Sequence, residues 1–233
     1  MSENELESFK ILHWLIYFCW NIGIFKPLLK YANIELNINP MDVLLHVLET
    51  KKNKLRELFS SMKNESTSEW FGTKKDLIAY YEDARNRNKL KEFKKLNAWW
   101  IAKLYSDNDL LNILYDDIVL CIENHSVKKY SNDVVWDELK NINSKLLSFG
   151  DLSKSEQSPI ISVHGKTIYY LNGDSRYVDK LNMKIYINRD NESAQWWDYY
   201  LDGESYSDVP INQFLSALEK GGSSRLLNSV VVQ

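Results

Sequence analysis

The sequence predicts a mainly α protein, in which a helical bundle-like N-terminal two-thirds is followed by a small α+β C-terminal region. Apolar residues recur at helical spacing, behind recognisable capping signals, as far as Leu146. Residues 151–159 are polar and rich in helix breakers, and beyond them the pattern favours strands. We therefore expect a helical domain at residues 1–150, a linker at 151–159 and a small α+β domain at 160–233.

Start and stop signals divide the N-terminal part into helices. Gly23 is expected to separate the first two helices, over residues 5–21 and 26–32. Asn39 and Pro40 are favourable as the N-cap and first residue of a helix. One long helix is expected to follow them, because apolar residues recur seven apart from Met41 to Met62.

Further caps predict the later helices. Thr73 and Asp76 have capping-box spacing ahead of a helix that carries Leu77 and Ile78. Apolar residues at helical spacing predict another helix over residues 93–104. Ser106 with Asp109 is expected to cap the next one. Ser131 is expected to open the last helix of the series, which should stop near Gly150.

In the C-terminal region, residues 160–163 and 166–170 are expected to form a β-hairpin around His164-Gly165. Apolar and polar residues alternate from Met183 to Asn188, which predicts a half-buried strand, with residues 195–201 as its neighbour. A helix is expected at residues 210–220, and the tail at 226–232 is expected to be an edge strand.

Composition and charge narrow the class of protein. Hydrophobic residues make up 44% of the chain and charged residues 26%, which predicts a folded core. The net charge of −3 argues against a nucleic-acid partner, because there is no global basic field. The most apolar stretch, residues 11–20, is about half the length of a bilayer-spanning helix, so we expect a core helix and no membrane partner. Its acidic flank does not resemble the positive start of a signal peptide.

The sulfur and imidazole side chains predict no metal, cofactor or nucleophile site. Cys19 and Cys121 lie far apart in apolar runs, which indicates buried thiols in a reducing compartment, so we expect a cytoplasmic protein. Two distant cysteines cannot hold an iron–sulfur cluster, and no zinc-ligand spacing is present. The four histidines, for which we expect structural or surface roles, are His13, His46, His125 and His164.

Two clusters allow alternative interpretations. Basic residues precede Trp99 and Trp100 and could hold a nucleic-acid strand, but their helical register favours a solvated helix face. Those basic residues are Arg85, Arg87, Lys89, Lys91, Lys94 and Lys95. The aromatic run from Trp196 to Tyr200, followed by Asp202, Glu204 and Asp208, could be a ligand or calcium site. Because four rings around one Asp must populate both faces of a strand, a surface or subunit contact is favoured.

One set of aromatics and turns carries a family resemblance. It comprises Leu12-His13-Trp14, Trp20, Pro27, Tyr31, Ile38-Asn39-Pro40, the run from Glu69 to Tyr81, and Lys95-Leu96-Asn97. Over residues 6–120 the chain thereby resembles the C-terminal helical region of cobalamin-binding radical SAM proteins. In that family this region follows a cobalamin-binding domain and a barrel with a Cys-x-x-x-Cys-x-x-Cys motif, and the present sequence contains neither.

The resemblance implies a non-catalytic accessory module: a detached tail, a truncated product or one subunit of a split enzyme. The iron–sulfur cluster, S-adenosylmethionine and cobalamin would then be bound by another polypeptide and not by this chain alone. The residues expected at its interface are Trp70, Tyr81, Trp99, Trp196, Trp197 and Tyr199.

Two other classes of function remain open. The chain is alternatively a free-standing adaptor or regulatory protein that binds a partner through residues 160–233, in which case deletion of that region should leave the helical part folded. The third possibility is an enzyme that uses a carboxylate pair such as Asp116-Asp117, although carboxylates are too common for sequence to locate an acid–base pair.

Overall fold

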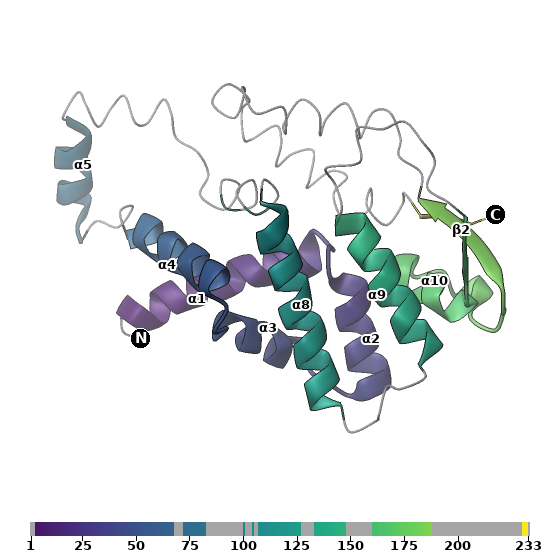
Figure 1. Cartoon of the computed structure of the whole chain (residues 1–233). Coiled ribbons are helices and arrows are strands. Elements are labelled where there is room, and N and C mark those ends of the chain that lie inside the picture. Colours follow the sequence, from purple (N-terminus) through teal and green to yellow (C-terminus); the bar gives the residue numbers. More distant parts are fainter. Residues whose placement is uncertain are drawn as a thin grey trace.

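The computed structural model confirms a mainly α protein with a small antiparallel sheet near the C-terminus (Figure 1). The structure describes residues 3–67, 72–82, 100, 104, 107–126, 133–147, 160–187 and 230–232. Its helices are α1 (Glu3–Ile16), α2 (Lys26–Leu36), α3 (Pro40–Leu48), α4 (Asn53–Thr67), α5 (Lys74–Glu82), α8 (Asn108–His125), α9 (Val134–Leu147) and α10 (Gly165–Asn172). The strands are β1 (Ile161–Val163), β2 (Met183–Ile187) and β3 (Val230–Val232).

The first two helices are separated at Gly23, as the sequence predicts. Helix α1 continues into a π-helical turn, η1 (Tyr17–Asn21), whose Tyr17 carbonyl accepts a hydrogen bond from the Ile22 N–H at 2.9 Å. Gly23 then has a φ of 89°, a conformation that glycine adopts without strain. The chain turns by 88° between residues 5–21 and Lys26–Leu36.

The expected long helix after Pro40 is two helices, so that prediction was wrong. The Asn39 side chain caps α3 as expected, since its Oδ1 accepts from the Met41 N–H at 3.0 Å. Residues 49–52 then leave the helix, and the Thr50 hydroxyl accepts from the Lys52 N–H and donates to Asp117. The seven-residue spacing of apolar residues does not reveal this break, because Leu55 is buried on α4 just as it would be in one continuous helix.

Two of the later caps also differ from the prediction. The N-cap of α8 is Asp107, whose carboxylate accepts from the Leu110 N–H at 3.1 Å, and not Ser106 as predicted. Ser106 itself lies outside the described residues, and its expected capping-box partner Asp109 forms an ion pair with Lys54. At the start of α9, Asp133 accepts from the Trp136 N–H at 3.2 Å. The predicted cap Ser131 and the expected helix end near Gly150 lie outside the described residues. The helix expected at 93–104 also lies outside them, except for Trp100 and Leu104.

The expected hairpin at residues 160–170 is a strand followed by a helix, so its second strand was wrongly predicted. Gly165 opens α10 because it lies against the η3 turn (Ser175–Tyr177). A Cβ at this position would lie 1.6 Å from the Tyr177 carbonyl oxygen, and the Gly165 N–H donates to the Lys180 carbonyl at 2.8 Å. Within α10, the buried residues Thr167, Ile168 and Leu171 follow helical spacing.

The sheet has the order β1-β2-β3, and both pairs are antiparallel. Ile185 of β2 lies opposite Ile161 on one side and Val232 on the other. The strands predicted at 183–187 and in the tail are therefore confirmed, with β3 at an edge of the described sheet. The predicted neighbour at 195–201 and the helix at 210–220 lie outside the described residues.

A continuous hydrophobic core joins the helices to the C-terminal elements. The buried residues of β1, α10 and β2, among them Val163, Ile168 and Ile185, belong to the same cluster as Trp14, Phe18 and the other buried residues of the helices. Helix α10 packs against both α2 and α9. The division into two domains stays a prediction, because residues 151–159 lie outside the described part of the chain.

Among the described residues, no single helix is both long enough and apolar enough to cross a membrane. The sharply bent pair formed by residues 5–21 and Lys26–Leu36 reaches that length and apolar character only when the two segments are counted together.

Candidate functional site

The aromatic residues expected at an interface fall mostly outside the described part of the chain. Tyr81 lies in α5, whereas Trp70, Trp99, Trp196, Trp197 and Tyr199 are not among the described residues, and neither are the predicted basic cluster at 85–95 and the acidic residues at 202–208. Trp100 is described, and it is a core residue: it is 3% exposed, and its ring meets that of Trp14 edge-on at 6.4 Å. Trp100 is therefore not available to stack on a nucleic-acid base.

Helix α5 carries the segment on which the family resemblance chiefly rests. Thr73 caps it as predicted, since its hydroxyl accepts from the Asp76 N–H at 3.2 Å and donates to the Asp76 carboxylate at 2.7 Å. Figure 1 shows α5 apart from the other helices, beyond the end of α4. Leu77 and Ile78 are 38% and 49% exposed, so this helix presents apolar surface to its surroundings.

A cluster of aromatic and charged residues lies where α2, α9 and α10 meet, and we call it the aromatic–carboxylate cluster. It consists of Tyr31 and Glu35 of α2, Trp136 of α9 with Asp133 at its N-terminus, and Lys166 and Tyr170 of α10. The Tyr31 ring stacks on Trp136 at 5.4 Å and meets Tyr170 edge-on at 5.3 Å. The Tyr31 hydroxyl donates to Asp133, and the Tyr170 hydroxyl donates to Glu35 at 2.5 Å.

Burial and hydrogen bonding together set the protonation of this cluster. Burial raises the pKa of the Tyr170 phenol far above its ordinary value, and the Glu35 carboxylate raises it further. Burial also raises the pKa of Glu35, but the hydrogen bonds from Tyr170 and from Lys166, which lies 2.9 Å away, outweigh it. The pKa of Glu35 is therefore lowered, so the phenol stays protonated and the carboxylate stays ionised.

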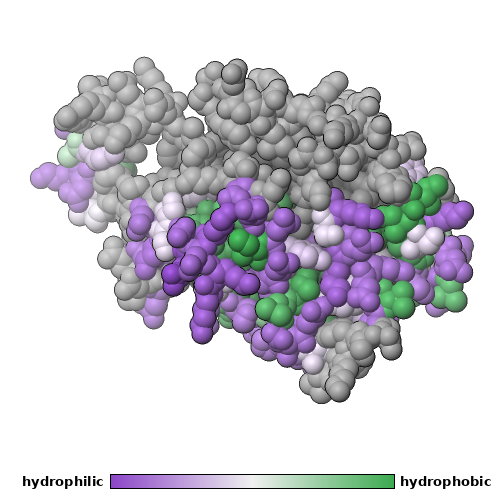
Figure 2. Space-filling model, viewed as in Figure 1, coloured by the Kyte–Doolittle hydropathy of each residue, from purple (hydrophilic) through white to green (hydrophobic). Residues whose placement is uncertain are grey.

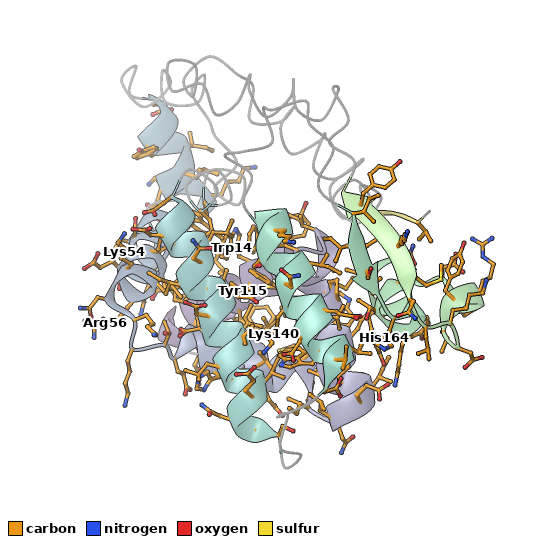
Figure 3. The ribbon with its side chains drawn as sticks, turned by 45° about the vertical axis from the view of Figure 1, so that its right-hand side comes forward. Trp14, Lys54, Arg56, Tyr115, Lys140 and His164 are labelled. Atoms are coloured by element: carbon orange, nitrogen blue, oxygen red, sulfur yellow. The ribbon has the colours of Figure 1, made fainter. Side chains whose placement is uncertain are left out.

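Glu138 of α9 binds the N-terminus of α10. Its carboxylate accepts hydrogen bonds from the His164 N–H at 2.9 Å and from the Thr167 hydroxyl, and it contacts the His164 Nδ1 at 2.8 Å. An anion is stabilised at a helix N-terminus by the unpaired N–H groups there. Figure 3 shows His164 beside the sheet, and its role in this contact matches the structural role expected from the sequence.

Helices α8 and α9 are joined by a second polar group. Glu123 accepts from the Trp136 indole N–H at 3.0 Å and from Lys140 at 2.9 Å. The Tyr115 hydroxyl donates to the Lys140 carbonyl at 3.1 Å, and Figure 3 shows both residues between the two helices. These ionisable groups bond to one another across the helix interface.

A third set of polar residues runs along α8 where it contacts α3, residues 49–52 and the start of α4, and we call it the α3–α8 seam. It comprises Asp42, His46, Thr50 and Lys54 on one side and Asp109, Asp117, Cys121 and His125 on the other. Thr50 donates to the buried Asp117, Lys54 pairs with Asp109 at 2.8 Å, and the rings of His46 and His125 lie 6.0 Å apart. The order of these pairs shows that the chain from His46 to Lys54 runs antiparallel to α8.

The two thiols are buried and unbridged, as the sequence predicts. Burial raises the pKa of Cys19 far above its ordinary value. Burial, with the nearby carboxylates of Asp117 and Asp42, raises the pKa of Cys121 to about 11. Neither thiol is therefore an activated nucleophile at neutral pH.

The carboxylates of Asp116 and Asp117 lie in different surroundings. Asp117 is 5% exposed and accepts from Thr50, while Asp116 is exposed on the outer side of α8. Across the described ranges, no three His, Cys, Asp or Glu side chains converge closely enough to hold a metal ion by themselves.

Sequence reasoning missed the partners in all three polar groups. Spacings of four residues recur in them, as in Tyr31 with Glu35, Lys166 with Tyr170, and Asp42 with His46. Such spacing puts both members of a pair on one helix face. It does not indicate which other helix the face meets.

The fold and these contacts define a mainly helical chain whose polar clusters join its helices. Comparisons with known protein families, with curated proteins and with solved structures find no match to it.

Proposed function

We propose that this chain is a non-catalytic helical module that acts by binding another protein through α5. The observation that carries the proposal is the exposure of Leu77 and Ile78 on a helix that lies apart from the core. The described part of the face seen in Figure 2 is mostly hydrophilic, with hydrophobic residues in small patches. Burying adjacent apolar side chains against a partner is favourable by about 25 cal/mol per Å² of apolar area.

A structural role for the ionisable side chains supports the absence of catalysis by the chain alone. Glu35, Asp133 and Glu138 accept hydrogen bonds from other helices or from the start of α10, and Glu123 joins α8 to α9. Each carboxylate therefore stabilises the helix packing. A catalytic acid or base instead needs to face a bound substrate.

The resemblance of residues 69–81 to cobalamin-binding radical SAM proteins identifies the partner that we propose. It is a radical SAM subunit that itself binds the iron–sulfur cluster, S-adenosylmethionine and cobalamin. We place the complex in the cytoplasm, which agrees with the buried, unbridged thiols of Cys19 and Cys121.

Affinity purification from the native host tests this proposal. Wild-type chain should recover a radical SAM subunit, identified by mass spectrometry, together with corrinoid absorbance. The double variant Leu77→Glu/Ile78→Glu should lose most of that recovery, because two charges would be buried in the interface. Lys74→Glu/Lys75→Glu is the matched control on α5, and it should recover more of the radical SAM subunit than Leu77→Glu/Ile78→Glu does.

Recovery of no radical SAM subunit by the wild-type chain would refute the proposed partner. Equal recovery by the Leu77→Glu/Ile78→Glu variant would refute α5 as the binding surface. Circular dichroism of each variant shows whether it is folded.

The alternative is a free-standing adaptor that binds through its C-terminal region. Ile160 and Leu181 favour it, since they are 56% and 70% exposed. Deletion of residues 160–233 is a poor test, because it would remove buried core residues such as Ile168 and Ile185. The variant Ile160→Lys/Leu181→Lys leaves the core intact, and loss of an unrelated partner in that variant would support the adaptor.

A further inference from the structure

The α3–α8 seam brings two imidazoles from different helices together at the protein surface. The ring centres of His46 and His125 lie 6.0 Å apart, and the ring planes are 77° apart. A zinc–nitrogen bond of about 2.0–2.1 Å puts each ring centre roughly 3.2 Å from the ion, so two rings that share an ion lie at most roughly 6.4 Å apart. At the tetrahedral angle that zinc prefers, the two ring centres lie roughly 5.2 Å apart, so the exposed rings must move roughly 0.8 Å closer to share an ion.

The hydrogen bond of His125 determines which of its nitrogens is available to a ligand. Its Nδ1 lies 2.8 Å from the carbonyl oxygen of Cys121, one turn earlier on α8. Since a carbonyl oxygen can only accept, Nδ1 must carry the proton. In the neutral ring, Nε2 therefore keeps its lone pair. Metal-binding histidines commonly have their other nitrogen held in this way by a backbone carbonyl.

The surrounding charges favour a cation. Asp42 lies one turn before His46 on α3, and Asp117 lies two turns before His125 on α8. Both carboxylates are close enough to Cys121 to interact with it electrostatically. Negative charge therefore lies near Cys121, whose carbonyl oxygen bonds the His125 ring.

A buried contact further along the seam holds α8 in place before any ion binds. The Thr50 hydroxyl, just after the end of α3, donates to the buried Asp117 of α8. His46 and His125 are both exposed, so an ion can reach them from solvent. A site whose supports are already formed loses less entropy when it binds an ion.

We propose that His46 and His125 form a two-imidazole site for a late first-row transition-metal dication, with Zn²⁺ as the probe, and that water completes the coordination. Imidazole suits Zn²⁺, Cu²⁺ and Ni²⁺. Two protein ligands and water suffice for this site, so it does not need three converging side chains. The bound ion would fasten α3 to α8.

Calorimetric titration of the untagged chain with ZnCl₂ tests the site. Wild-type protein should bind one equivalent saturably. His46→Asn and His125→Asn should each weaken binding by at least about tenfold, because even the loss of an outer partner of a metal ligand weakens binding by about 10–100-fold. His13→Asn, which changes an exposed histidine on α1, is the control and should bind as the wild type does. Cys121→Ser should also retain binding.

Thermal unfolding provides a second measurement. Zn²⁺ should raise the Tm of the wild type and of His13→Asn, because an ion that binds only the folded state stabilises it. It should leave the Tm of His46→Asn/His125→Asn unchanged. Three results would each overturn the proposal: no saturable binding to the wild type, unchanged affinity in the double variant, or loss of binding in Cys121→Ser.

Discussion

The aromatic–carboxylate cluster and the α3–α8 seam use similar residue types in different surroundings. In the cluster, Tyr31 and Tyr170 are almost fully buried, and their hydroxyls donate to carboxylates on other helices. In the seam, His46 and His125 are exposed. Polar groups that are shielded from water must bond to one another, whereas exposed ones keep the capacity to bind a ligand. We infer that the aromatic–carboxylate cluster stabilises the fold and that the α3–α8 seam is the better candidate for binding a ligand.

The largest effect is expected from Trp136→Ala in the cluster. Trp136 is 0% exposed, stacks on Tyr31 and donates to Glu123 at 3.0 Å. Its removal should lower the free energy of unfolding by about 4 kcal/mol. Urea unfolding followed by circular dichroism measures this value. Leu181→Ala, at a residue that is 70% exposed, should change it by less than about 0.5 kcal/mol.

Gly165→Ala should have the next largest effect. The new Cβ would lie 1.6 Å from the Tyr177 carbonyl oxygen, so the backbone must shift, and we expect a loss of about 3 kcal/mol. Gly173→Ala at the other end of α10 is the matched control: nothing lies within 4 Å of its Cβ, but its φ is 82°. That variant should lose only about 1 kcal/mol, and equal losses would contradict the close approach.

Tyr170→Phe should destabilise the cluster by about 1–2 kcal/mol, because Glu35 loses a hydrogen bond in a half-buried place. Urea unfolding at pH 7 measures the loss. Tyr169→Phe, next to it on α10, is the control and should have a smaller effect. If the two variants lose the same stability, the bond to Glu35 contributes nothing specific.

Glu35 should also make stability depend on pH. Its pKa in the folded state lies below its ordinary value of 4.5, so its contribution is present above that value and is lost as the pH falls through the folded pKa. The stability of the wild type should therefore fall more between pH 6 and pH 3 than that of Glu35→Gln. Urea unfolding at each pH checks this, and parallel profiles would rule out the contribution.

The smallest effect is expected from Lys54→Ala in the seam. The side chains of Lys54 and Asp109 are 48% and 75% exposed, so solvent screens their attraction and stability should not change measurably. Thr50→Val in the same seam removes the hydroxyl partner of the buried Asp117 and should lose about 1–2 kcal/mol. Equal stability of the two variants in urea would remove the distinction between buried and exposed polar contacts.

Features that depend on neighbouring residues were predictable from the sequence. The Asn39 and Thr73 caps and the break at Gly23 each need only a few adjacent residues, and all three are confirmed. The strand at 183–187 is confirmed for the same reason, since alternation along one segment determines its buried face.

Features that depend on distant residues were not predictable. Thr50, in the break between α3 and α4, bonds to Asp117, 67 residues away, and Gly165 opens α10 in close approach to Tyr177. In the cluster, the Tyr31–Asp133 and Tyr170–Glu35 bonds join residues 102 and 135 positions apart. Nothing in the local pattern around these side chains indicates such partners.

The sequence by itself determined the fold class, the starts of α3 and α5, the break at Gly23 and the burial of both thiols, because each depends on local periodicity and composition. Only the tertiary structure decided which helix faces meet, where the polar groups of α2, α9 and α10 find their partners, and that His46 lies against His125. The physical reason is that the sequence of a helix determines which of its faces is buried, whereas the packing of the whole chain determines which other helix covers that face.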